Sequence, residues 1–575
     1  MRKDFPENQP PRVGAGGQNW RRPARSLAAL CVSVVLISCT PDLYHTRADG
    51  EAYSVLFQKT PAVENVDPVN VDIDENEPVD LSKYGENSSG AAFLGEMAVH
   101  EEGAKVLDLA DALEAGVTHG RDYLDEKESV FLSALDLTLA RYRLSPILSA
   151  DGSANRANDT RTAELEEGFN ELVATNTFAR NQSAGFNWLY KTGARISADF
   201  TQDFLRIMTG NRSFNESDLA VSIAQPLLRG GGTTVTLEAL TQEERNVLYD
   251  LRGFADFRRS FVVDVVSDYY NVLEARDQVQ NNYVAYQGFL ENVEREEAFG
   301  EEGLRTQTEL GQLRQAALQS ESRWINSVRS YQTQLDNLTL RLGLPVEEKI
   351  MLDEKELTRL RIEEPPLTRD EAVEIALVTR PDLATAVNRV EDAERRIEVA
   401  KNGLLPGLDI SLDYNAISDP GDTTPDINWD RRRWSTSLDV DTALDRKAER
   451  NIYRASLVSL ERAERSKELA FDRARLEIYD AWRALDQARR NFAIAEQGVA
   501  LAAKRLEEQR LLSELGRGEA RDLVDAQNDL VDAQNQRTST VIDHTLARLR
   551  LWRDMGVLYI NRDGSWVKKL ENEPR

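Results

Sequence analysis

The sequence predicts an α+β membrane protein that combines a long antiparallel α-helical coiled-coil barrel with a transmembrane β-barrel. Two helical stretches of about 65 residues each indicate the coiled coils, because no globular core needs helices of that length. Paired segments with alternating apolar and polar residues indicate membrane strands. An apolar segment near the N-terminus, preceded by basic residues, indicates export.

Residues 1–38 look like a lipoprotein signal peptide. They carry six basic residues against two acidic ones and lead into the apolar run SLAALCVSVVLISC, residues 26–39. This run is shorter than the roughly 20 residues of a membrane-spanning helix, but its length suits the hydrophobic part of a signal. It ends in LISC, which resembles the bacterial lipobox and implies that Cys39 is lipidated. The alternative is an ordinary buried cysteine.

The segment after the signal, residues 39–103, is acidic and interrupted by prolines. It contains the stretch PAVENVDPVNVDIDENEPVDLSKYGENSSG, which has no sustained helical or strand periodicity. Segments of this composition bury too little apolar surface to order themselves. We therefore expect a lipid-anchored tether with largely irregular structure.

From residue 104 the chain runs twice through one order of elements: helix, β-hairpin, very long helix and return helix. Residues 104–343 form the first copy and residues 367–558 the second. A charged connector, residues 344–366, joins them, and residues 559–575 form a C-terminal tail. Both copies open with Leu and Ala at helical spacing and stop at Pro or polar residues, which indicates an internal duplication.

Each hairpin places apolar residues at alternate positions. The first pairs residues 186–200 with 218–224, and the second pairs 408–415 with 434–441. The apolar or aromatic-rich set comprises Phe186, Trp188, Tyr190, Thr192, Ala194, Ile196, Ala198, Phe200, Leu219, Val221, Ile223, Leu408, Ile410, Leu412, Tyr414, Trp434, Thr436, Leu438 and Val440. This pattern is typical of membrane barrel strands, although a half-buried soluble sheet alternates in the same way. Because four strands cannot enclose a channel, we expect a trimer with four strands per protomer, which leaves no free edge in lipid.

The long helices are predicted over residues 233–299 and 447–512, each about 100 Å long at about 1.5 Å per residue. In the second helix, eleven consecutive positions at 3-4 spacing are apolar, and large residues alternate with alanine: Phe471, Ala474, Ile478, Ala481, Leu485, Ala488, Phe492, Ala495, Val499, Ala502 and Leu506. Such a repeat requires a partner helix and a left-handed supercoil. The return helix offers Leu523, Ala526, Leu530 and Ala533.

Two motifs strengthen this interpretation: SIAQPLLRGGG, residues 222–232, and RPDLATAVNRVEDAERRIEVAKNGLLPGLDISLDY, residues 380–414. Together with the features above they resemble the TolC-type outer-membrane efflux protein family, over about residues 104–558. The resemblance implies a homotrimer with a twelve-stranded barrel on a long helical barrel that narrows at its periplasmic tip. It implies a lipid-anchored protein of the outer membrane of a diderm bacterium that extends into the periplasm.

The resemblance also assigns roles at the tip, where GLRTQTELGQ (303–312) and ELGRGEARDLVDAQ (514–527) form the two turns. Asp522 and Asp525 match the two aspartates that ring the closed entrance in the family, so they are the predicted periplasmic gate. The alternative is a pair of solvated carboxylates near a helix N-terminus. Four residues resemble the tips that the family presents to its periplasmic adaptor: Gly303, Leu304, Leu515 and Gly516.

One departure concerns the latch that holds the family's tip closed. Where the family type member has a tyrosine and an arginine, this chain has Ser513 and Gly518. Arg517 lies one position away, and Glu309 occupies the acidic partner position. A Glu309–Arg517 pair is the expected replacement.

Several function classes are disfavoured by composition. The formal net charge of −27 disfavours nucleic acid as a partner, because the phosphate backbone would repel this surface. The four histidines are scattered, and the run Gly230–Gly232 lacks the Lys-Ser/Thr of a phosphate loop, so we expect no enzyme, no metal and no cofactor.

The expected function is therefore that of an exit duct in a tripartite efflux system. Small molecules would pass from an inner-membrane pump and a periplasmic adaptor to the exterior. An exit duct for type I protein secretion is one alternative. A lipid-anchored periplasmic coiled-coil scaffold without transport is the other.

Overall fold

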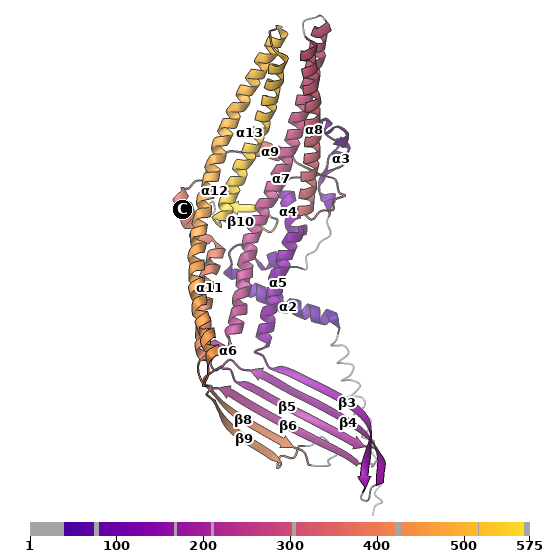
Figure 1. Ribbon diagram of the computed structural model, residues 1–575, viewed down its shortest axis with the longest axis vertical. Helices are drawn as coiled ribbons and strands as arrows, with labels where there is room; N and C mark the ends of the chain where they lie inside the picture. The colour runs from indigo at the N-terminus through magenta and orange to yellow at the C-terminus, as the bar shows by residue number, and fades with distance from the viewer. Residues whose placement is uncertain are drawn as a thin grey trace, which may run out of the picture.

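The computed structural model describes residues 40–73, 80–165, 169–208, 212–301, 306–419, 427–442, 444–515 and 517–568. Long helices run along one axis and stand on a β-sheet at one end (Figure 1). The two longest are α7 (Glu238–Glu301) and α12 (Lys447–Glu514), each followed by a return helix, α8 (Gln307–Arg341) and α13 (Ala520–Asp554). These bounds agree with the long helices that the sequence predicts.

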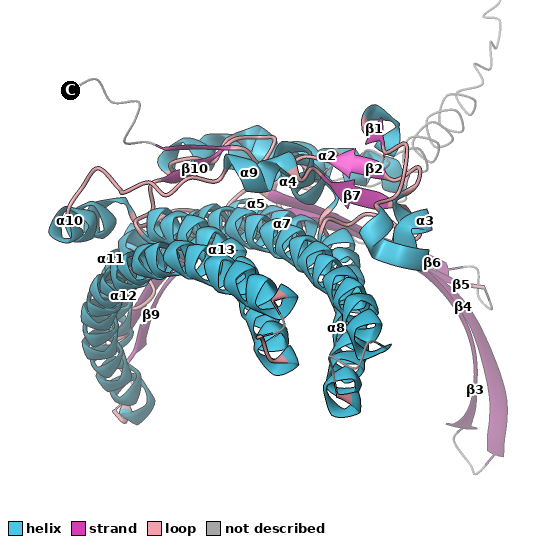
Figure 2. Ribbon diagram, turned by 90° about the horizontal axis from the view of Figure 1, so that it is seen from above, coloured by secondary structure: helices cyan, strands magenta, loops and turns pink. Residues whose placement is uncertain are grey.

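The predicted seam of α12 is confirmed. All eleven of its apolar positions are buried or half-buried, because α12 packs against α13 in its upper half and against α11 (Pro381–Gly403) nearer the sheet. Seen from above, α12, α13, α7 and α8 lie along one arc (Figure 2). None of the described helices is long and apolar enough to cross a bilayer.

The two repeats open in the same way, with a short helix, a break and a longer helix. In the first repeat these helices are α4 (Leu109–His119) and α5 (Arg121–Tyr142), and in the second they are α10 (Arg369–Thr379) and α11. Capping boxes start α4, through Asp108, and α10, through Thr368. The breaks fall at Gly120 and before Pro381. A Cβ on Gly120 would lie 2.3 Å from the Gly116 carbonyl oxygen.

The main sheet is antiparallel, with the strand order β3-β4-β5-β6-β8-β9. Its strands are β3 (Ile147–Leu165), β4 (Phe169–Leu189), β5 (Arg195–Ile207), β6 (Arg212–Pro226), β8 (Gly407–Ile417) and β9 (Arg432–Asp441). Within this single chain the sheet is open, and β3 and β9 are its edges.

The prediction of four strands per protomer is wrong, because this sheet has six strands in the described part of the chain. Residues 186–200 are not one strand but the end of β4, a turn and the start of β5. The five-residue turn keeps alternate positions on one face, so Trp188 pairs with Ile196 and the sequence pattern continues unbroken. Strand β3 was missed because small and polar residues dominate it.

The prediction of a largely irregular tether over residues 39–103 is also wrong for its described part. Helix α2 (Pro41–Lys59) buries Ala52, Val55 and Leu56 and packs against α5. Lys59 and Arg141 both pair with Glu244 on α7. A stripe of only three apolar residues is a weak signal in an acidic sequence, but α5 and α7 supply the surface that orders it.

Short elements complete this region and its neighbours. They are η1 (Thr60–Ala62), η2 (Pro68–Val71), η3 (Leu81–Lys83), β1 (Gly85–Glu86), η4 (Ala92–Met97), α3 (Ala98–Glu101), β2 (Lys105–Leu107), α6 (Thr233–Thr236), β7 (Ile350–Leu352), α9 (Lys355–Arg359), β10 (Leu558–Ile560) and β11 (Trp566–Lys568). Strand β2 pairs with β1 and with β7, and β10 pairs with β11. The predicted tail boundary at residue 559 therefore falls inside β10.

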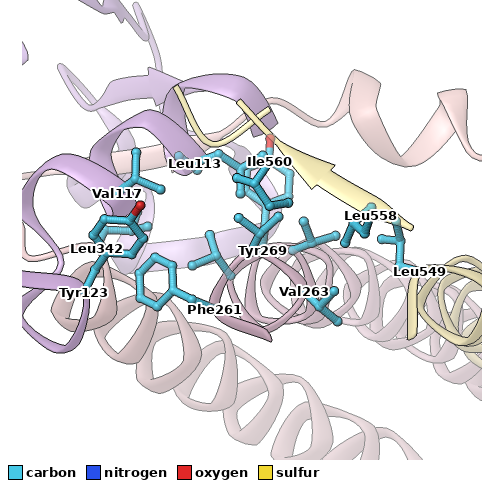
Figure 3. Packing of buried hydrophobic residues seen from close by; sticks show 14 of the residues in the cluster. Leu113, Val117, Tyr123, Phe261, Val263, Tyr269, Leu342, Leu549, Leu558 and Ile560 are labelled. Carbon is cyan, nitrogen blue, oxygen red and sulfur yellow. The ribbon is translucent and has the colours of Figure 1, made fainter. Parts of the chain in front are cut away.

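The main core lies around the middle of α7. Figure 3 shows Tyr123 and Phe261 beside Leu342, and Leu558 and Ile560 lying over α7. Two buried arginines of α7 hold backbone carbonyls of the C-terminal hairpin. The Arg258 guanidinium donates to the Ile560 oxygen at 3.0 Å, and Arg259 donates to the Leu558 oxygen at 3.2 Å.

A buried ion pair joins the N-terminal segment to α7. Arg276 donates to Glu101 from Nε at 2.9 Å and from Nη2 at 3.1 Å, and both side chains are about 5% exposed. The Tyr331 hydroxyl donates to the same carboxylate at 3.1 Å, and the Arg276 guanidinium lies 4.9 Å from the Phe93 ring centroid. The pair has the additional hydrogen bonds that a buried charge needs.

The substitution Glu101→Gln should loosen this attachment, because Arg276 then keeps only Glu354, a largely exposed carboxylate, as its countercharge. Breaking a buried pair costs about 3 kcal/mol, so amide hydrogen exchange over residues 91–102 should accelerate about 100-fold. Glu86→Gln, which removes the exposed carboxylate that pairs with Lys105, is the control and should change exchange little. Equal exchange in both variants would show that the pair does not hold the segment.

Buried His544 should make the helical region sensitive to acid. Burial, with help from Arg548 and Arg489, lowers the pKa of His544 below its usual 6.5, while Glu363 opposes this shift. The imidazole therefore stays neutral in the folded protein and takes up a proton on unfolding, so stability is lost as the pH falls below about 6.5. The melting temperature, measured by circular dichroism of the helices, should fall between pH 7.5 and pH 5.5. This fall should be smaller in His544→Gln than in the wild type. The exposed His45, replaced by Gln, is the control and should retain the wild-type fall.

Candidate functional site

The turn between α12 and α13 lies at the end of the helices farthest from the sheet (Figure 1). The backbone amides of Arg517 and Gly518 both donate to the Leu512 oxygen, at 2.9 and 3.0 Å. A Cβ on Gly518 would lie 2.8 Å from the Ser513 nitrogen. Glycine at this position is therefore part of how the turn closes.

Asp522 and Asp525 lie in the first turns of α13, and both are exposed. Leu523, which lies between them, and Ala526, which follows Asp525, are buried against Leu506 of α12. The two carboxylates thus project from the side of α13 that does not pack on its partner helix. Arg521 lies 3.9 Å from Asp525, but exposed pairs of this kind contribute little to stability.

Glu309 has a local role at the start of α8. Its carboxylate accepts from the Thr306 amide at 2.8 Å and from the Thr306 hydroxyl at 2.9 Å, and the Thr306 hydroxyl accepts from the Glu309 amide. This is a capping box. The described residues include no ion pair between Glu309 and Arg517, so this chain alone does not bring the predicted latch together.

The structure instead places a buried polar contact between the two helix pairs. The Ser513 hydroxyl on α12 donates to Glu296 Oε1 on α7 at 2.5 Å, and the two residues are 5% and 2% exposed. In the sequence, Ser513 stands out only as a departure from the family pattern, and nothing marks Glu296 as its partner. Glu296 faces the other helices of the bundle. Helical periodicity in the sequence does not show that a glutamate is buried at such a position.

Further polar contacts lie between the two helix pairs. The Thr538 hydroxyl donates to Asp277 at 2.7 Å, and Asn281 donates to Asn535 at 2.9 Å. Arg323 of α8 donates to Asn528 of α13 at 2.6 Å. Within each pair, by contrast, the buried contacts near the tip are apolar, as in the clusters around Phe289 and Leu506. The ion pairs that join Arg314 to Glu297 and Arg505 to Asp529 within the pairs are exposed and contribute little.

This difference has an energetic consequence. Water can replace hydrogen bonds when two surfaces separate, so each such bond contributes only about 1 kcal/mol net. Exposing buried apolar surface to water costs free energy that no contact with water restores. The helix pairs should therefore move relative to each other more easily than either pair comes apart.

The other predicted site residues lie at the same end or outside the described chain. Leu515, at the end of α12, is 71% exposed, as an adaptor-contacting residue must be. Gly303, Leu304 and Gly516, and the predicted lipidation site Cys39, lie outside the described residues.

At the opposite end, the sheet has one apolar and one polar face. One register row across all six strands contains Leu148, Phe186, Ala198, Val221, Tyr414 and Trp434. The adjacent row, on the other face, contains Ile147, Asn187, Ser197, Ser222, Asp413 and Ser435. Polar side chains bond to one another on this face: Ser222 donates to Asp413 at 2.7 Å, and Asn415 donates to Asp218 at 2.6 Å.

The contact between Ser513 and Glu296 should couple the two helix pairs energetically. In a double-mutant cycle with Ser513→Ala and Glu296→Ala, we expect a coupling energy of about 1.5 kcal/mol, because the bond is buried and its acceptor is a carboxylate. Hydrogen exchange over residues 290–300 and 508–515 measures it. Ser459→Ala is the control, since the Ser459 hydroxyl bonds only within its own helix, to the Ala455 oxygen. Additive effects of the two substitutions would refute the coupling.

Comparison with known proteins identifies the fold. No protein-family model matches the sequence, and no curated protein is similar to it at a significant level. Solved structures do match. The CmeC outer membrane channel of Campylobacter jejuni is 13% identical, with 84% of this chain and 91% of that chain covered and a TM-score of 0.58. The outer membrane protein VceC of Vibrio cholerae is also 13% identical, with 78% and 96% covered and a TM-score of 0.58.

CusC is 15% identical, with 84% of this chain and 97% of that chain covered and a TM-score of 0.57, and its description refers to transmembrane channel formation. The matches extend over nearly the whole of these proteins, so the likeness covers both the helices and the sheet. This chain has the fold of these outer-membrane channels.

Proposed function

We propose that the protein is the outer-membrane exit duct of a tripartite efflux system, which passes small molecules from an inner-membrane pump and a periplasmic adaptor to the exterior. One observation carries the proposal: a single chain joins a sheet with an apolar and a polar face to helices of 64 and 68 residues. Helices of this length span about 100 Å, which suits a wall that crosses the periplasm. The solved relatives are described as outer-membrane channels.

The duct would be a homotrimer. An open sheet exposes unpaired backbone groups along β3 and β9, and such edges are too costly to leave in lipid. Copies arranged around an axis would close the sheets into a β-barrel with the apolar face outward. The arc of α12, α13, α7 and α8 supports the same arrangement for an α-helical barrel (Figure 2).

The gate would lie at the far end of the helices. Asp522 and Asp525 from three copies would place six carboxylates around one aperture. Such a ring attracts cations and repels anions, and it makes a narrow opening selective. The exposed position of both side chains, away from the seam with α12, supports this role.

The tip would also bind the partners. Leu515, with Gly303, Leu304 and Gly516, would contact the periplasmic adaptor. Between copies, Glu309 and Arg517 would be the latch, while the contact between Ser513 and Glu296 holds the helix pairs within one copy. Acyl chains on Cys39 would anchor the mature N-terminus in the outer membrane. We propose no catalytic activity and no cofactor.

Single-channel conductance of the purified protein in a planar bilayer tests the duct and the gate together. Wild type should give small, cation-selective currents that trivalent cations block. The double substitution Asp522→Ala with Asp525→Ala should weaken this block about tenfold or more and reduce cation selectivity, because it removes the charges at the aperture.

The matched control is Asp472→Ala with Asp480→Ala, which removes two exposed carboxylates of α12 away from the turn. If the gate variant conducts like wild type, the duct stands and the gate assignment fails. If trimers insert and none conducts, the protein is not a channel, and the scaffold interpretation takes its place.

A further inference from the structure

Strands β3 and β4 form a hairpin of which the sequence predicts only the end of β4, from Phe186, as part of the membrane wall. Together with the pair β5–β6, they give the first repeat four strands, whereas the second repeat contributes only β8 and β9. The two repeats are otherwise alike in their helices. The hairpin is therefore the main asymmetry between them, and its position in the sheet decides how copies of this chain fit together.

We propose that this hairpin is part of the barrel wall, so that β9 of one copy pairs with β3 of the next and each copy contributes six strands. This inference rests on the proposed function. A trimer closed in this way has eighteen strands rather than twelve. Because barrel diameter grows roughly linearly with strand number, the lumen would be about half as wide again as that of a twelve-stranded barrel.

The first argument is that the division into two faces continues from the rest of the sheet into the first rows of the hairpin. In the apolar row, Leu148 on β3 and Phe186 on β4 continue the series of Ala198, Val221 and Tyr414. The next positions of β3 on that face are Ala150, Gly152 and Ala154, all uncharged. Arg180, which pairs with Ala154, is the first charge of the hairpin on this face. Over the three rows before it the hairpin keeps this face uncharged, which a hairpin outside the wall would not need to do.

The opposite face of β3 is polar over the same length. It carries Ser149 in the row of Asp199, Asp151 in the row of Asp218, and Ser153 in the row of Asp203 and Glu216. This arrangement is expected of a strand with one face toward lipid and the other toward water.

The second argument is length and direction. The pairing of β4 with β5 covers Thr177–Leu189, and opposite it β3 runs from Ile147 to Ala157. Strands β8 and β9 have 11 and 10 residues. A tilted strand needs about 9–11 residues to cross a membrane, so all of these are long enough. Since six antiparallel strands alternate in direction, β9 and β3 run in opposite directions, and their pairing would be antiparallel like every other pair in the sheet.

The third argument concerns the two edges. Leu148 and Trp434 stand at opposite ends of the apolar row and are 82% and 69% exposed. Seen from above, β3 and β9 lie at opposite ends of the arc that the helices follow (Figure 2). If β9 of one copy pairs with β3 of the next, the unpaired backbone groups of both edge strands form hydrogen bonds. A barrel with only four strands from each copy would require β5 to separate from β4, although the two strands are paired along the whole length of β5.

Cysteine crosslinking in the full-length protein tests the proposal. Leu148→Cys on β3 is combined in turn with Trp434→Cys, Thr436→Cys and Leu438→Cys on β9, since the stagger between copies is not known and these positions share one face. After oxidation in outer membranes, at least one pair should give a dimer or trimer band under non-reducing conditions, because antiparallel neighbours approach within disulfide range. The single-cysteine variants, each of which keeps the native cysteines, show the background.

The competing geometry has its own pair. Ala198→Cys on β5, combined with the same β9 positions, should crosslink only if the barrel closes without the hairpin. Crosslinks from β5 and none from β3 would overturn the proposal and leave the duct intact. No crosslink from either strand in a protein that is trimeric and conducts would also overturn it. No crosslink together with no trimer and no conductance would remove the proposed function as well.

Discussion

The structure depends on the burial of α7. Phe254, Val265, Val266 and Tyr269 are fully buried, because helices α5, α8, α11 and α13 pack around α7 from different sides. A surface helix buries one stripe, whereas α7 is covered for much of its length. Arg258, Arg259 and Arg276 are buried with it, and each donates to carbonyls or carboxylates from other segments. Removing a guanidinium from water is costly, so these partners must be in place when the helix packs.

This requirement connects the two ends of the described chain. Arg258 donates to Asn65 in the N-terminal segment and to Ile560 in the C-terminal hairpin, and the Tyr559 hydroxyl donates to Glu64. Segments nearly 500 residues apart thus meet on one turn of α7. They lie at the middle of the helices, between the sheet and the tip (Figure 1), on the outer side of the arc (Figure 2). Their contacts with α7 hold the helices together at this height.

The character of the contacts changes along the molecule. The middle holds a large apolar core, the tip has buried apolar seams within the helix pairs and buried polar contacts between them, and the sheet has opposite faces of different polarity. Each arrangement matches what its region must do in the proposed duct. A rigid middle supports the wall, a polar contact between the helix pairs permits opening, and a two-faced sheet separates lipid from water.

The sequence by itself determined the long helices, the α12 seam and the helix breaks of both repeats, because their periodicity and capping are local properties. It also located the tip turns and the exposed pair Asp522 and Asp525. Tertiary structure alone decided the rest. Burial of Glu296 against Ser513, folding of residues 41–59 onto α5, and the register of β3 against β4 all depend on surfaces distant in sequence. A local sequence pattern cannot predict whether a glutamate, a short apolar stripe or a polar strand will be buried. The segment against which each of them packs lies far away in the chain.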